Sequence, residues 1–153
     1  MSSWFHRVKK YVWDEEKTPF HLLPVEMHKK QAHNELFIYA AIEGILTAIL
    51  IFGILAQIFM GGKIAYVPLL VYSLMLMGAL YVLVNRKPIW AALVSSSPPL
   101  VMFGLLFWFG FHPNNTSFDK LILGGFLVFW VIYSVRIFDI CRNYPEMAET
   151  VNS

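Results

Sequence analysis

Four long stretches of apolar residues, separated by short polar connections, occupy most of the chain between residues 36 and 141. A helix needs about 20 mostly apolar residues to cross the hydrocarbon core of a bilayer, and each stretch reaches that length. The pattern therefore predicts an all-α integral membrane protein, a four-transmembrane-helix bundle with spans at 36–60, 64–84, 89–111 and 121–141. In this division residues 1–35 form an amino-terminal arm, and residues 142–153 form a carboxyl-terminal tail.

The composition indicates the same surroundings. Apolar residues make up 58% of the chain and charged residues 14%, against about 45–50% and about 25% in soluble domains. We therefore expect the lipid bilayer to surround residues 36–141. No basic run is dense enough to bind nucleic acid. The single cysteine, Cys141, excludes a disulfide within the chain and a CxxC redox pair, and we interpret it as a small residue near a helix end.

The distribution of Lys and Arg predicts the orientation. With four spans, both termini and the middle connection lie on one side of the membrane. That side carries ten basic residues, and the other side carries two, Lys63 and Lys120. By the positive-inside rule, both termini are predicted to be cytoplasmic. The protein is then a multi-pass membrane protein, of the inner or plasma membrane in a bacterium, whereas for a eukaryote the sequence does not indicate which membrane.

A short amphipathic segment precedes the first span. Within residues 3–13, the side chains of Trp4, Phe5, Val8, Tyr11 and Val12 share one helical face, and basic residues occupy the remainder. Such a segment is typical of an interfacial helix on the inner leaflet. Packing against a larger complex explains the pattern equally well. Two later prolines prevent this helix from running on into the first span.

Three ionisable residues lie within the spans: Glu43 in the first, and Arg136 and Asp139 in the fourth. Charges in hydrocarbon are costly and mark either function or an interhelical pair. We expect Glu43 to pair with Arg136 and Asp139 to share the guanidinium group. The alternatives are a ligand or proton site, a contact with another subunit, or, for the two residues of the fourth span, side chains that reach to the interface.

The third span contains a serine run followed by two prolines. Pro98 and Pro99 lack amide donors and clash with preceding carbonyl groups, so the helix is expected to kink or open there. The hydroxyl groups before the break could satisfy the freed carbonyls or bind a ligand. The predicted polar layer, structural or ligand-binding, comprises Glu43, Thr47, Ser95, Ser96, Ser97, Arg136 and Asp139.

The first span has two distinct stripes. Tyr39, Glu43 and Thr47 recur every four residues and form a polar stripe. A second stripe, about 100° away, consists of small residues that let another helix approach closely. These are Ala40, Gly44 and Ala48.

The sequence contains little that indicates catalysis. All five histidines lie outside the spans, so no span supplies an axial ligand for a haem. His28 and His33 are five residues apart, about 140° around a helix, whereas a helical metal pair needs a spacing of three or four. Nucleotide-binding, hydrolase and metalloprotease motifs are absent. We expect no enzyme activity, no catalytic residue, no metal and no cofactor.

Three hypotheses about function remain. The first is a non-catalytic accessory or assembly subunit, bound to a membrane-protein partner or to further copies of itself. The second is a small oligomeric transporter or channel that uses the polar layer in the cytoplasmic half of the bilayer. The third, an enzyme acting on lipid at the cytoplasmic interface through residues 21–35, has the weakest support in the sequence.

Overall fold

The computed structural model describes residues 22–61 and 66–149, so the amphipathic helix predicted at 3–13 lies outside the described residues. The described part is helical and contains no strand. Its elements are η1 (Pro24–Glu26), α2 (Lys29–Phe59), α3 (Val67–Arg86), α4 (Ile89–Ser95), α5 (Pro98–Phe109), α6 (Ser117–Asn143) and η3 (Tyr144–Glu146).

Four helical segments of the described chain are long and apolar enough to cross a membrane, which confirms the predicted all-helical class. They are α2, α3, the pair α4–α5 and the segment that α6 begins. The protein thus has the features of a multi-pass membrane protein. Insertion itself, and the side on which the termini lie, stay predictions.

Helix α2 begins at Lys29, before the start of the apolar run at Leu36. His28 caps it: its Nδ1 atom accepts the Gln31 amide at 3.4 Å, and the Gln31 side chain accepts the His28 amide at 3.2 Å. The part of the helix that precedes its apolar run, from Lys29 to Leu36, is therefore about 10 Å long. Hydropathy detects only that apolar part.

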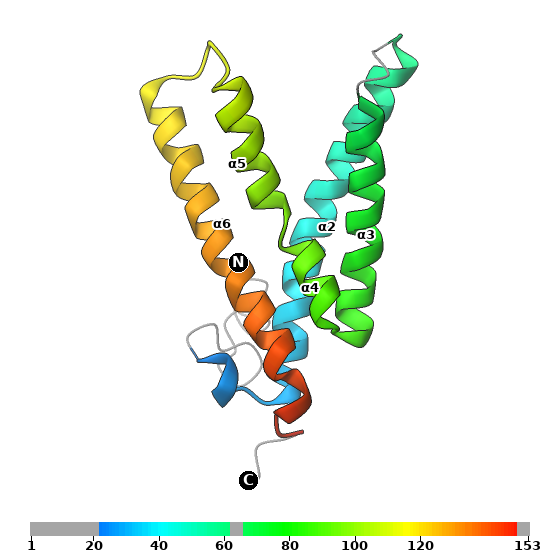
Figure 1. Cartoon of the computed structure of the whole chain (residues 1–153), viewed down its shortest axis with the longest axis vertical. Coiled ribbons are helices and arrows are strands. Elements are labelled where there is room, and N and C mark those ends of the chain that lie inside the picture. Colours follow the sequence, from blue (N-terminus) through cyan, green and yellow to red (C-terminus); the bar gives the residue numbers. More distant parts are fainter. Residues whose placement is uncertain (1–21, 62–65, 150–153) are drawn as a thin grey trace, which may run out of the picture.

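The helices form two hairpins that meet at one end and diverge at the other (Figure 1). Helix α2 packs against α3, and α5 packs against α6. The short helix α4 contacts both α3 and α6 and so connects the hairpins. We call the end that contains α4 the base, and the end where α2 ends, α3 begins and 109–117 lie the open end.

An interruption in the third span allows this arrangement. Helix α4 ends at Ser95, and α5 begins at Pro98, the first of the two prolines at which the sequence predicts a break. Prolines fit the first turn of a helix because its amide groups have no partner within the helix. On the base side of the break, α4 packs against α3 and α6. On the side of the open end, α5 packs against α6.

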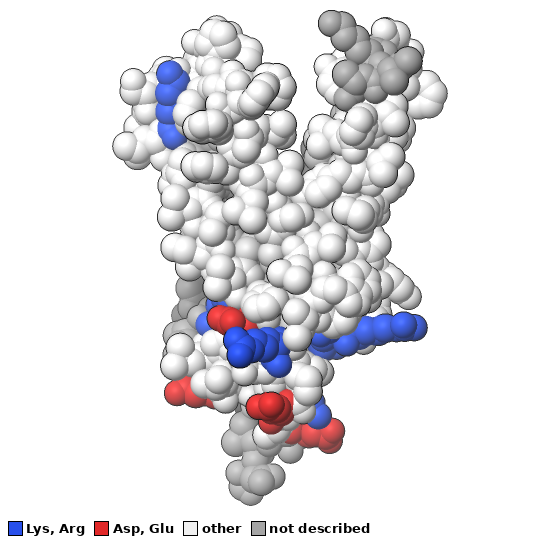
Figure 2. Space-filling model, viewed as in Figure 1, with Lys and Arg blue, Asp and Glu red and all other residues white. Residues whose placement is uncertain are grey.

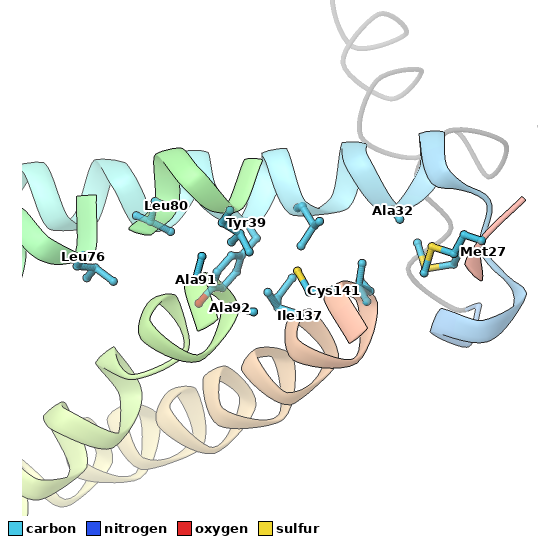
Figure 3. Close-up of a cluster of buried hydrophobic side chains, with 13 residues drawn as sticks. Met27, Ala32, Tyr39, Leu76, Leu80, Ala91, Ala92, Ile137 and Cys141 are labelled. Atoms are coloured by element: carbon cyan, nitrogen blue, oxygen red, sulfur yellow. The ribbon is translucent and has the colours of Figure 1, made fainter. Parts of the chain in front are cut away.

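The hydrophobic core lies at the base, where α2, α3, α4 and α6 approach one another (Figure 3). Leu36, Leu83, Ile137 and Ile140 are fully buried there, from α2, α3 and α6. Cys141 is also buried in this cluster. Most of the acidic and basic side chains visible in Figure 2 gather at the same end, while the surface above them shows few charged side chains.

The stripe of small residues on α2 faces the neighbouring hairpin helix only in part. Ala40 and Gly44 line a shallow depression with Met77 and Tyr81 of α3. A Cβ atom added at Gly44 would meet no other atom within 4 Å. The close helix approach that the sequence predicts at this stripe is therefore not made at Gly44 by the described residues.

Candidate functional site

The buried ion pair of the base joins Arg136 of α6 to Glu35 of α2. The Arg136 Nε atom donates to Glu35 Oε1 at 2.6 Å, and one terminal nitrogen donates to Oε2 at 3.0 Å. The Glu35 side chain is fully buried. Such a two-bond geometry is the strong form of an arginine–carboxylate pair.

The predicted pairing of Glu43 with Arg136 is wrong. Arg136 lies about 10 Å from the base end of α6, and Glu35 lies about 9 Å from the base end of α2, so the two are level. Glu43 is eight residues further along α2, about 12 Å toward the open end. The sequence pattern favours Glu43 because Glu35 precedes the first apolar run and falls at the end of the predicted amino-terminal arm.

The same guanidinium group also holds the chain that precedes α2. Its remaining terminal nitrogen donates to the Leu22 carbonyl at 2.7 Å, and the terminal nitrogen that bonds Glu35 lies 3.8 Å from Met27 Sδ. Asp139 does not share this group, contrary to the sequence prediction. In the described chain only its backbone carbonyl is engaged, by the Asn143 side chain at 2.8 Å. Each of the three guanidinium nitrogens of Arg136 thus has a partner within the described chain.

The serines at the break in the third span are also engaged. The Tyr39 hydroxyl of α2 donates to the Ser95 carbonyl at 2.7 Å, and Ser96 Oγ donates to the Ser134 carbonyl of α6 at 3.2 Å. Ser97 Oγ shares a 2.7 Å hydrogen bond with the Tyr72 hydroxyl of α3. The three serines at the break are therefore hydrogen-bonded to the three other long helices, α2, α3 and α6.

Removing the Tyr39 hydroxyl should lower stability measurably. Tyr39→Phe leaves the Ser95 carbonyl without its partner in a buried position, so we expect the free energy of unfolding to fall by about 1 kcal/mol. Unfolding in mixed micelles would measure this. Tyr81→Phe, on the exposed face of α3, is the matched control, and equal effects of the two changes would contradict the structural role of this bond.

Glu43 is a buried acid that no cation among the described residues neutralises. Its side chain is 3% exposed, and among the described residues no Lys, Arg or His lies within ion-pair distance of it. Trp130 of α6 lines the same cavity as Glu43. Thr47 does not bond the Glu43 carboxyl group: its hydroxyl donates to the Glu43 backbone carbonyl at 2.8 Å.

The Glu43 side chain borders a cavity of about 350 Å³ between the two hairpins. Figure 2 shows the surface hollowed between the hairpins at the open end. We call this space the cleft cavity. It is lined by Glu43, Leu46, Thr47, Leu50, Leu69, Tyr72, Leu76, Pro98, Val101, Met102, Leu105, Phe126 and Trp130.

The lining of the cleft cavity is apolar apart from a few groups near Glu43. Among the described residues that line it, Glu43 is the one acidic or basic side chain, and Tyr72, Trp130 and Thr47 supply the other polar side-chain atoms. Sequence reasoning identified Glu43 and Thr47 through their spacing on α2. It missed Tyr72 and Trp130, because aromatic residues are common in membrane spans and their spacing carried no signal.

No group of three His, Cys, Asp or Glu side chains that could hold a metal ion occurs in the part of the chain that the structure describes. No family model, curated protein or solved structure matches the chain. The features of the described chain that bear on its function are the geometry of the cleft cavity and the exposed helix faces.

Proposed function

We propose that the protein is a non-catalytic membrane protein that binds a hydrophobic or amphiphilic molecule in the cleft cavity, in the manner of a small transporter or channel. One observation carries the proposal: an apolar cavity between two hairpins of membrane length has a buried, unneutralised carboxyl group in its wall. Ligand sites are typically apolar clefts of about 300–1,000 Å³ with a few placed polar groups.

The position of the cavity suits a ligand that enters from the bilayer. Along α2 its lining extends from Glu43 to Leu50, and along α5 from Pro98 to Leu105, in each case about 10 Å toward the open end. All four membrane-length segments contribute to it. An apolar molecule would contact apolar walls over this length, and its polar end would reach Glu43.

The lining supports binding more than catalysis. As far as the structure describes the chain, the lining contains no His, Cys, Lys or Arg, and its hydroxyl groups belong to Thr47 and Tyr72. Thr47 already donates to its own helix. A hydrolytic or transfer reaction needs a nucleophile next to a base, and Glu43 has no such neighbour in the wall.

Filling the cleft cavity should abolish binding of a compact apolar probe. We would label the protein in lipid nanodiscs with a neutral, photoreactive adamantane diazirine and map the adducts by mass spectrometry. We expect saturable labelling of 46–50 and 101–105 that unlabelled adamantane suppresses. Val101→Trp should reduce that labelling about tenfold, because the indole occupies the cavity.

Val128→Trp, on an exposed face of α6, is the matched control and should leave the labelling unchanged. Labelling that does not saturate, or that is equal on lipid-facing and cavity-facing residues, would refute a binding cavity. Transport is a separate step. After reconstitution, Glu43→Gln should change the flux of a bound molecule, and absent or unaltered flux would reject the transporter form of the proposal.

The exposed helix faces favour a second candidate, an accessory or assembly subunit. Helix α6 buries the smallest share of its apolar window within the chain. Near the open end, Phe107, Trp108 and Phe109 are each at least 76% exposed. A membrane-protein partner or a further copy of the chain could cover these faces. Copurification in mild detergent tests this role, which a monodisperse, unaccompanied protein from its native membrane would contradict.

A further inference from the structure

We propose that the cleft cavity selects amphiphiles with a cationic amine head, which the Glu43 carboxylate binds while the apolar body lies against α2 and α5. This inference rests on the proposed binding function and specifies the ligand class for the same cavity. Three features support it: the charge of the cavity wall, the aromatic side chains beside Glu43, and the geometry of the Arg136–Glu35 ion pair.

The charge balance of the cavity favours a cation. A buried carboxylate without an opposite charge is costly, and a bound ammonium group would remove that cost. None of the described residues in the cavity wall is a basic side chain that could serve instead. An anionic head would face Glu43 without any basic group to offset the repulsion, so anionic amphiphiles should be excluded.

Arg136 is not available to neutralise Glu43. Both Glu35 oxygens, the Leu22 carbonyl and the Met27 sulfur surround its guanidinium group. These contacts use each of its three nitrogens. Moving Arg136 toward Glu43 would leave Glu35 buried and unpaired, which exchanges one uncompensated carboxylate for another. The counter-charge of Glu43 must therefore come from outside the described residues.

The wall beside Glu43 suits an alkylated ammonium group. Phe126 and Trp130 both line the cavity, and their ring centroids are 5.4 Å apart at an interplanar angle of 49°. Aromatic faces attract ammonium groups, most strongly where water is excluded. A carboxylate has about four acceptor positions, so the single N–H of a neighbouring indole such as Trp130 could not occupy them all, and an amine would still find acceptors on Glu43.

The test compares two competitors of equal shape and different charge. With the neutral diazirine probe in nanodiscs, adamantyl-trimethylammonium and its uncharged isostere tert-butyladamantane would compete for labelling of 101–105, each corrected for its concentration in the bilayer. We expect the cation to compete at least about tenfold better than the isostere. Glu43→Gln should remove that preference and leave competition by the isostere within about twofold.

Glu146→Gln, an exposed carboxyl group at the base, is the control and should retain the preference. If Glu43→Gln does not fold, Glu43→Asp keeps the charge and should keep a preference for the cation. Equal competition by the two compounds in the parent protein would overturn the cation inference and leave the binding function intact. Absence of saturable labelling by the neutral probe would remove both.

Discussion

Replacing Arg136 with methionine is expected to lower the free energy of unfolding by about 3–5 kcal/mol, the usual cost of breaking a buried ion pair by removing one partner. Glu35 would remain fully buried without its counter-ion, and the Leu22 carbonyl would lose its donor. The segment before α2 would also be released from α6. Equilibrium unfolding in mixed micelles measures the change.

Two further variants test whether the pair itself is responsible. Arg142→Met removes a charge from the same helix at an exposed position and should change stability by less than about 0.5 kcal/mol. The double variant Glu35→Gln/Arg136→Met should lose at least about 1 kcal/mol less than the sum of its single changes. Similar values for Arg136→Met and Arg142→Met would show that the pair does not stabilise the base.

Shortening Ile137 to alanine should destabilise the protein by about 2–5 kcal/mol. Ile137 is fully buried in the base cluster, where α6 meets α2 and α4. The substitution leaves a cavity whose lining loses dispersion contacts, and this loss persists where lipid replaces water as the solvent. Because the hairpins are joined at the base, we expect the change to act on the whole fold.

Ile132→Ala on the same helix is the matched control for this prediction. Ile132 is 64% exposed, so its side chain faces the surrounding medium before and after unfolding, and we expect a change below about 0.5 kcal/mol. Both variants can be unfolded in the same micelles. A loss for Ile132→Ala as large as that for Ile137→Ala would mean that the base core does not join the hairpins.

The helices themselves were predictable because their signals are local. Apolar runs and the Thr116–Asp119 pair, which caps α6 with hydrogen bonds of 3.2 and 2.8 Å, lie within a few residues of what they determine. The prolines at 98 and 99 likewise mark the interruption before α5. The candidate acid Glu43 could be selected from the sequence because an ionisable residue within an apolar run is rare.

The partners of those residues were not predictable. Arg136 and Glu35 are 101 residues apart, and their meeting depends on how far α2 continues past its apolar run toward the base. That extension comes from the His28–Gln31 cap, which hydropathy does not register. As a result, the sequence predicted one polar layer, whereas the structure separates the Arg136 pair from Glu43 by about two helical turns.

The amino-acid sequence alone determined the helical class, the four membrane-length segments and the place where the third one breaks, because each depends on neighbouring residues. Only the tertiary structure decided that two hairpins diverge from a shared base and that Glu43 borders the cavity between them. The physical reason is that hydrocarbon accepts any apolar helix face equally well. Which faces meet is therefore set by a few polar contacts and by core packing between distant segments, and neither is written in local hydropathy.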